Sequence, residues 1–100
     1  MHSSPDAVNL AFTDSFGNAI RYNGEVNDDN VPHGNGTADY YDAIPTGFYN
    51  GEWQNGLNEG YGEMEWSNGN WYKGGWLAGQ WHGNGSKKIG GRIFNLTYVE

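Results

Sequence analysis

Three glutamates near the middle of the chain could do chemistry if the fold brought them together. Glu63 and Glu65 alternate beside Tyr61, and Glu52 falls on the strand that we expect to pair with theirs. Glycoside hydrolases use such a pair of carboxylates, one as the acid and the other as the nucleophile or base. This chemistry needs a deep cleft that raises the pKa of one carboxyl group, and a single small sheet cannot build one. We therefore expect no catalytic residue and no enzymatic activity.

Residues that could bind a metal ion are scarce. The chain has no cysteine, which excludes disulfides and thiolate sites. His33 and His82 occupy equivalent places, each before Gly-Asn-Gly, and a turn explains such a duplicated position better than metal binding does. Asp28-Asp29-Asn30 is acidic but lacks the glycine and the terminal glutamate of a calcium loop. We expect neither a metal nor another cofactor.

Charge is distributed unevenly along the chain. The net charge is −7, and it divides into −10 for residues 1–66 and +3 for residues 67–100. Solubility alone can account for this excess of acids. The functional alternative is a polarised surface whose acidic part binds a basic partner. Direct binding of nucleic acid is not expected, because phosphates require a basic face.

A repeated pattern of aromatic residues and glycines should form the fold that positions these charged side chains. Tyr22-Asn23-Gly24 aligns with Tyr49-Asn50-Gly51 and with Tyr72-Lys73-Gly74, and a Gly-x-Gly follows each tyrosine at 11 or 12 residues. The tyrosines are 27 and 23 residues apart, so the first unit is the irregular one. The residues that we expect to build the fold are Tyr22, Gly24, Tyr49, Gly51, Trp53, Gly62, Trp66, Tyr72, Gly74 and Trp76.

This pattern resembles the MORN family, in which Tyr-x-Gly-x-Trp is followed by Gly-x-Gly at a similar spacing. The resemblance covers residues 22–91 and implies tandem β-hairpins in a scaffold or dimerisation module that self-associates through a terminal strand. Val26 stands where the family has tryptophan, and Phe94-Asn95-Leu96 lacks the glycine. Both departures fit terminal repeats that act as caps.

Strand alternation predicts the same architecture. Tyr49, Gly51 and Trp53 share one face, and Asn55-Gly56 is a strong hairpin signal. We predict an all-β fold: a single elongated, twisted antiparallel β-meander of about eight strands with little or no helix, in which rings lie over glycines. The expected organisation is an N-terminal capping hairpin strand region at 1–21, repeats at 22–48, 49–71 and 72–91, and a degenerate capping strand at 92–100.

The face opposite the packed rings should carry aromatic residues among acids. Such a surface is typical of a protein interface. The alternative is that both faces carry rings because the thin sheet curls on itself or dimerises. The candidate partner-binding residues are Glu25, Asp39, Tyr41, Phe48, Glu52, Tyr61, Glu63, Glu65 and Trp71.

These features favour a non-enzymatic protein-binding module or small scaffold, with a homodimer through a free sheet edge as a further expectation. One alternative is a small acidic inhibitor of the phage or mobile-element counter-defence type, such as an anti-CRISPR protein. It would block the basic nucleic-acid-binding surface of a target enzyme. Lipid association is another alternative, which the acids of residues 1–66 disfavour. Carbohydrate binding on the aromatic rings is the last alternative.

The first residues, Met1 to Asp6, lack the basic region and apolar run of a signal peptide. We therefore expect a cytoplasmic protein, in its own organism or in an infected host cell.

Overall fold

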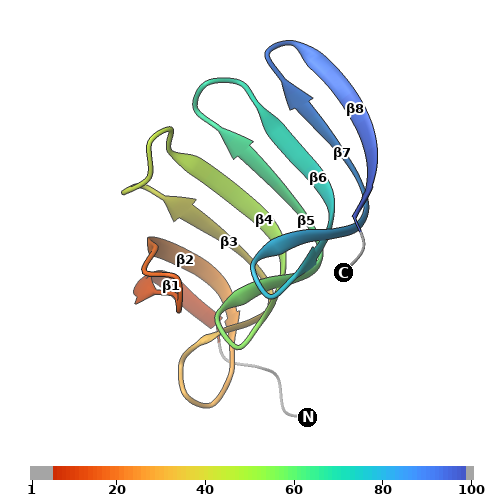
Figure 1. Cartoon of the computed structure of the whole chain (residues 1–100). Coiled ribbons are helices and arrows are strands. Elements are labelled where there is room, and N and C mark those ends of the chain that lie inside the picture. Colours follow the sequence, from red (N-terminus) through yellow and green to blue (C-terminus); the bar gives the residue numbers. More distant parts are fainter. Residues whose placement is uncertain (1–5, 99–100) are drawn as a thin grey trace.

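The computed structural model describes residues 6–98 as one open sheet of eight antiparallel strands, with no helix in that range. The strands lie across the sheet in chain order, so each neighbouring pair forms a hairpin (Figure 1). The predicted all-β meander is confirmed, although the last two residues of the predicted capping strand, 99–100, lie outside the described residues. The strands are β1 (Asp6–Thr13), β2 (Ala19–Val26), β3 (Pro32–Tyr40), β4 (Gly47–Gln54), β5 (Leu57–Trp66), β6 (Trp71–Leu77), β7 (Gln80–Ile89) and β8 (Arg92–Tyr98).

Two-residue turns close several of these hairpins. Asn55-Gly56 joins β4 to β5 with φ angles of 49° and 87°, and Ala78-Gly79 joins β6 to β7 with 49° and 82°. Two consecutive positive φ angles define a type I′ turn, which matches the right-handed twist of the strands that it joins. The Asn-Gly pair makes the first of these turns predictable. The second places an alanine in a conformation that alanine rarely adopts.

The tyrosine rings lie over the glycines, as the sequence predicts. Tyr22, Tyr49 and Tyr72 each have 0% of their surface exposed. A Cβ atom built on Gly62 would overlap the Tyr49 hydroxyl group, so a side chain at this position would displace the ring. The same hydroxyl group donates a hydrogen bond of 2.9 Å to the backbone carbonyl of Glu52. Each tyrosine thus packs on bare backbone and satisfies its polar end there.

Two tryptophans fill the spaces between the tyrosines. Trp53 meets Tyr22 and Tyr49 edge to face, with ring centroids 5.2 Å apart in both pairs. Trp76 meets Tyr49 and Tyr72 in the same way, at 5.3 Å. Both indole N–H groups donate to backbone carbonyls at 3.1 Å. We call the side of the sheet that carries these five residues the ring face. Its aromatic ladder supplies half of the buried hydrophobic residues found in 6–98, which explains how a chain poor in aliphatic residues folds.

The two glycines of a Gly-x-Gly serve different needs. In β5, the register shifts between the pairs Gly51–Gly62 and Trp53–Asn58, so the strand bulges between them. Gly60 lies in this bulge with a φ angle of 82°, a conformation that favours glycine. Gly62 is the residue that leaves room for the tyrosine ring. The motif therefore combines a backbone requirement with a packing requirement.

The sheet curls until its first hairpin meets the tips of later ones. Strongly bent strands are visible in Figure 1. A Cβ atom on Gly56 would lie 2.7 Å from Cζ of Phe12, and one on Gly79 would lie 2.8 Å from Cε2 of Phe16. Phe12 and Phe16 therefore pack against the β4–β5 and β6–β7 turns. This curl shields the ring face without a second sheet, in a molecule with extents of 44 × 26 × 22 Å.

Both ends of the repeat depart from the regular unit. Val26, at the position of Trp53 and Trp76, is 3% exposed and pairs with Pro32. In β8, Leu96 lies opposite Gly85, where the other units place a glycine. A leucine at this position removes the bare backbone on which an aromatic ring would lie. The pattern of rings over glycines therefore ends at this strand.

Candidate functional site

Four of the predicted partner-binding residues form one row across neighbouring strands. In the registers of β3 to β6, Asp39 lies opposite Phe48, Phe48 opposite Glu65, and Glu65 opposite Trp71. Directly opposed residues have Cβ atoms about 4.5–5.5 Å apart, so these side chains are contiguous. Strand alternation adds Glu63, two residues before Glu65, to the same side. We call the surface formed by these five residues the acidic face.

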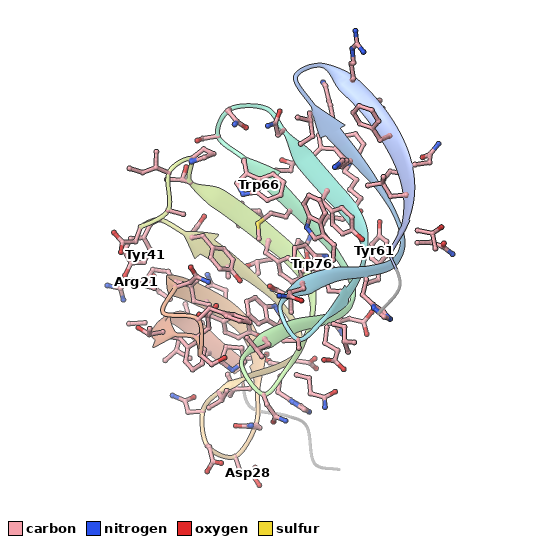
Figure 2. All side chains as sticks on the ribbon, viewed as in Figure 1. Arg21, Asp28, Tyr41, Tyr61, Trp66 and Trp76 are labelled. Carbon is pink, nitrogen blue, oxygen red and sulfur yellow. The ribbon has the colours of Figure 1, made fainter. Side chains whose placement is uncertain are left out.

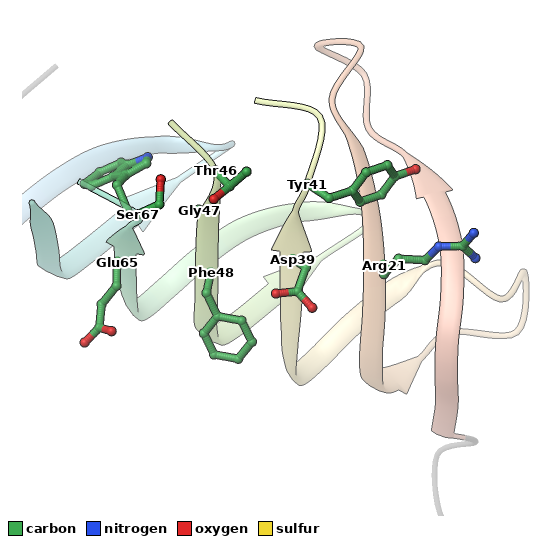
Figure 3. A pocket seen from close by; sticks show the side chains of 9 residues that line it. Arg21, Asp39, Tyr41, Thr46, Gly47, Phe48, Glu65 and Ser67 are labelled. Carbon is green, nitrogen blue, oxygen red and sulfur yellow. The ribbon is translucent and has the colours of Figure 1, made fainter. Parts of the chain in front are cut away.

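The acidic face is open to solvent. The side chains of Asp39, Phe48 and Glu65 project to the same side of three adjacent strands (Figure 3). Phe48 is 43% exposed, which is high for a phenylalanine on a strand, and Asp39 and Glu65 are also exposed. Tyr41, just beyond β3, is 51% exposed and lines a cavity of about 700 Å³ with these three side chains. The exposed Phe48 ring thus lies between two exposed carboxylates on one side of the sheet.

Basic side chains flank the acidic face but do not neutralise it. Arg21 lies opposite Asp39 in the β2–β3 register, yet its guanidinium group extends away from that carboxylate (Figure 3). No salt bridge to Asp39 or Glu65 is present in residues 6–98. On the other side, Lys73 places its Nζ atom 4.8 Å from the ring centroid of Trp71. Trp71 is therefore partly covered, and Lys73 also lies opposite Glu63 in the β5–β6 register.

Tyr61 and Glu63 form a polar pair beside this row. The Tyr61 hydroxyl donates a hydrogen bond of 2.9 Å to Oε2 of Glu63. This hydrogen bond to the carboxylate, with smaller contributions from burial and from the charge of Glu63, raises the pKa of Tyr61. Tyr61 is 53% exposed, on a central strand of the sheet (Figure 2). It remains a neutral hydrogen-bonding aromatic at physiological pH.

Two of the nine predicted partner-binding residues have a structural role. One carboxylate oxygen of Glu25 accepts the backbone N–H of Asn35 at 2.6 Å. Glu52 accepts the backbone N–H of Tyr61 at 3.0 Å. Both N–H groups follow the positive-φ glycine of a bulge, where the sheet ladder is interrupted. Glu25 and Glu52 thus satisfy donors that the bulges leave unpaired.

His33, one of the two histidines that precede a Gly-Asn-Gly, contacts a hairpin turn. Nδ1 of His33 accepts the backbone N–H of Asn55 at 3.2 Å. Glu59, at the equivalent place in the next unit, accepts the backbone N–H of Ala78 at 3.4 Å. The residue before each of these Gly-x-Gly motifs therefore holds the next hairpin turn. Within residues 6–98 no group of three or more metal-binding side chains is found.

A further cavity, which the sequence did not indicate, lies on the ring face. It measures about 450 Å³ and is lined by Asp14, Asn58 and three tryptophans, among others. Trp66, predicted as structural, is one of these and is half-buried, with its ring centroid 6.3 Å from that of Trp81. The only available signal was a polar Asn58 at a ring-face position of β5.

No described helix is long and apolar enough to cross a membrane.

The comparisons identify the repeat. A search of curated proteins gives no match for this chain. The family model of the MORN repeat matches three segments, residues 22–42, 49–71 and 72–88, which together make up more than half of the chain. Each segment begins at one of the three buried tyrosines of the ring face. The chain therefore belongs to the MORN-repeat family.

Proposed function

We propose that this protein binds a basic protein surface through its acidic face. MORN repeats are often protein- or lipid-binding modules, which is consistent with a non-enzymatic binding role. The observation that carries the proposal is the row formed by Asp39, Phe48 and Glu65, in which an exposed ring lies between two carboxylates without a salt-bridge partner in residues 6–98. Aromatic anchors inside a charged rim are typical of interfaces.

The charge of this face selects the class of partner. Carboxylates over β3 to β5 attract lysine and arginine side chains and repel phosphate groups. Nucleic acid and anionic lipid headgroups are therefore disfavoured as direct ligands at this surface. A protein whose own surface binds nucleic acid is favoured, because it presents the required basic patch. The inhibitor of a nucleic-acid-binding enzyme is the narrower form of this proposal.

The experiment compares affinity capture from a host lysate by the wild-type chain and by the variant D39N/E63Q/E65Q. We expect the wild-type chain to retain a basic protein and the variant to lose it, because three negative charges leave the acidic face. The variant D28N/D29N serves as the charge control, since Asp28 lies in the β2–β3 turn (Figure 2) and is exposed. Glu52 is left unchanged because it supports the bulge of β5.

Salt provides a second readout. Rising salt should weaken the captured complex, because exposed charges separated by more than about 10 Å are screened at 0.1 M ionic strength. Binding that is insensitive to salt and equal in both variants would contradict the proposed face.

A further inference from the structure

A cleft on the ring face contains a polar group that lacks its partner. Asn58 is 5% exposed, and its Nδ2 atom is buried with no hydrogen-bond partner among residues 6–98. Its Oδ1 atom accepts only a long hydrogen bond, 3.4 Å, from the hydroxyl of Tyr40. Buried amide groups in proteins are nearly always paired, so an unpaired one calls for an explanation. The residue lines the cavity of about 450 Å³, a volume within the range of about 300–1,000 Å³ of small-molecule sites.

A second polar group that lines the cleft, the carboxylate of Asp14, is an acceptor held by hydrogen bonds. Oδ1 of Asp14 accepts the backbone N–H groups of Phe16 and Asn18, both at 2.9 Å, and Oδ2 accepts the side chain of Asn18 at 3.0 Å. A carboxylate has about four acceptor positions, so Oδ2 retains one. Asp14 is 9% exposed and lines the same cavity as Asn58. The cleft therefore offers both a hydrogen-bond donor and a hydrogen-bond acceptor.

The remaining walls are mostly aromatic. Trp66, Trp76 and Trp81 line the cleft together with the ring of Phe16, and Trp66 and Trp76 lie on the ring face in Figure 2. The described residues that line it include no lysine or arginine, so a phosphate or carboxylate ligand would find no counter-charge among them. A cation would leave the Asn58 donor unpaired. The chemistry is suited to a neutral ligand with apolar faces and with groups that both donate and accept hydrogen bonds.

We propose that the ring-face cleft of Asp14, Asn58 and the three tryptophans binds a neutral carbohydrate. A pyranose ring has C–H faces that pack on indole rings, and each hydroxyl group both donates and accepts. One hydroxyl donates to Oδ2 of Asp14, and another accepts from Nδ2 of Asn58. The amide reaches it by rotating about its last torsion, which is broad for asparagine, and this rotation breaks only the long hydrogen bond from Tyr40.

A neutral glycan array, carrying glucose, mannose, galactose and N-acetylglucosamine oligomers, tests the proposal. Array hits are titrated by calorimetry, and the indole N–H signals of the wild-type chain are followed by NMR. We expect at least one neutral glycan to bind and to shift the signals of Trp66, Trp76 and Trp81. Sialylated glycans should not bind, because the cleft has no cation among its lining residues.

Variants separate this site from the acidic face. Asn58→Leu removes the donor and should weaken glycan binding about tenfold. The matched change Asn50→Leu is exposed on the other side of the sheet and should leave glycan affinity unchanged. If Asn58→Leu does not fold, Gln80→Ala at the exposed rim of the cleft replaces it, with an expected loss of about threefold.

Three results would overturn the proposal. They are the absence of any neutral glycan from the array hits, equal affinity in the cleft variants and the Asn50→Leu control, and displacement of the glycan by a peptide that gives the same indole shifts. Loss of protein capture by D39N/E63Q/E65Q does not bear on this site, so the two proposals fail or succeed separately.

Discussion

The buried tyrosine hydroxyls are the clearest single-residue contributors to stability. Tyr49 is 0% exposed and donates to the carbonyl of Glu52, whereas Tyr61 is 53% exposed and bonds a carboxylate at the surface. Tyr49→Phe keeps the ring and removes this part-buried hydrogen bond. We expect a loss of about 1 kcal/mol in the free energy of unfolding, measured by urea denaturation. Tyr61→Phe is the control, and an equal loss in both variants would contradict this assignment.

The glycine beneath the Tyr49 ring gives a second test at the scale of the residue. In Gly62→Ala the new Cβ atom would overlap the Tyr49 hydroxyl and must push the ring out of its place. We expect a loss of about 1–3 kcal/mol, the usual cost of overpacking a core, in thermal or urea unfolding. Gly90 has open space around its Cβ position and a φ angle of 57°, the left-handed conformation that asparagine tolerates. Gly90→Asn should change stability by less than about 0.5 kcal/mol. An unchanged melting temperature in Gly62→Ala would argue against this packing.

Among the elements, the two edge strands differ in how they are protected. In β1 the register shifts between Ala7 and Leu10, and Asn9 has a φ angle of 53° with its N–H bonded to the side chain of Asn23. Such a bulge prevents a second chain from adding to the edge. β8 pairs with β7 in unbroken register from Gly83–Tyr98 to Ile89–Arg92. The homodimer predicted from the sequence is therefore expected at β8 rather than at β1.

A lysine on the open edge tests this expectation. Ile93, in β8, is 63% exposed, and charged residues on edge strands disfavour edge-to-edge pairing. We expect the wild-type chain to associate with rising concentration in analytical ultracentrifugation and Ile93→Lys to remain monomeric. Ile44→Lys makes the same change in a loop residue that is 99% exposed and should behave like the wild-type chain. A wild-type chain that is monomeric at every concentration would refute the edge dimer.

At the scale of the whole molecule, the aromatic core makes stability depend on alkaline pH. Burial is the main reason that the pKa values of Tyr22 and Tyr40 rise to about 12. Burial likewise raises the pKa of Tyr49. In the unfolded chain these groups lose their protons near pH 10, so between about pH 10 and 12 the folded state binds more protons than the unfolded state. Stability is therefore fully present below about pH 10 and decreases as the pH rises toward 12.

Tyrosinate absorbance and circular dichroism, followed together, check this dependence. We expect an exposed group of tyrosines to ionise first and the buried group to ionise together with the loss of sheet structure. If all seven tyrosines ionised near pH 10 while the sheet stayed intact, the buried environment of the core would be refuted.

Much of the architecture could be predicted because it depends on local rules. Strand alternation assigned Tyr49, Gly51 and Trp53 to one face, and the Asn55-Gly56 pair gave a turn. The turn at Ala78-Gly79 could not be predicted in this way, because an alanine at positive φ is not a local preference. In both turns the first residue donates its backbone N–H to a side chain of the preceding hairpin, Asn55 to His33 and Ala78 to Glu59. Contacts between successive hairpins therefore hold these turns.

The candidate binding surfaces likewise combine features that the sequence predicts with features that depend on the tertiary structure. The sequence by itself determined the repeat, the meander and the row of acids and rings on one face, because the two-residue period of a strand fixes which side chains share a side. It did not show that Glu25 and Glu52 are engaged by the bulges. Nor did it show that the β1–β2 turn closes over the ring face, where Phe16 meets Gly79. Only the tertiary structure decided these features, because the curl of the sheet joins residues distant in sequence through packing that no local pattern encodes.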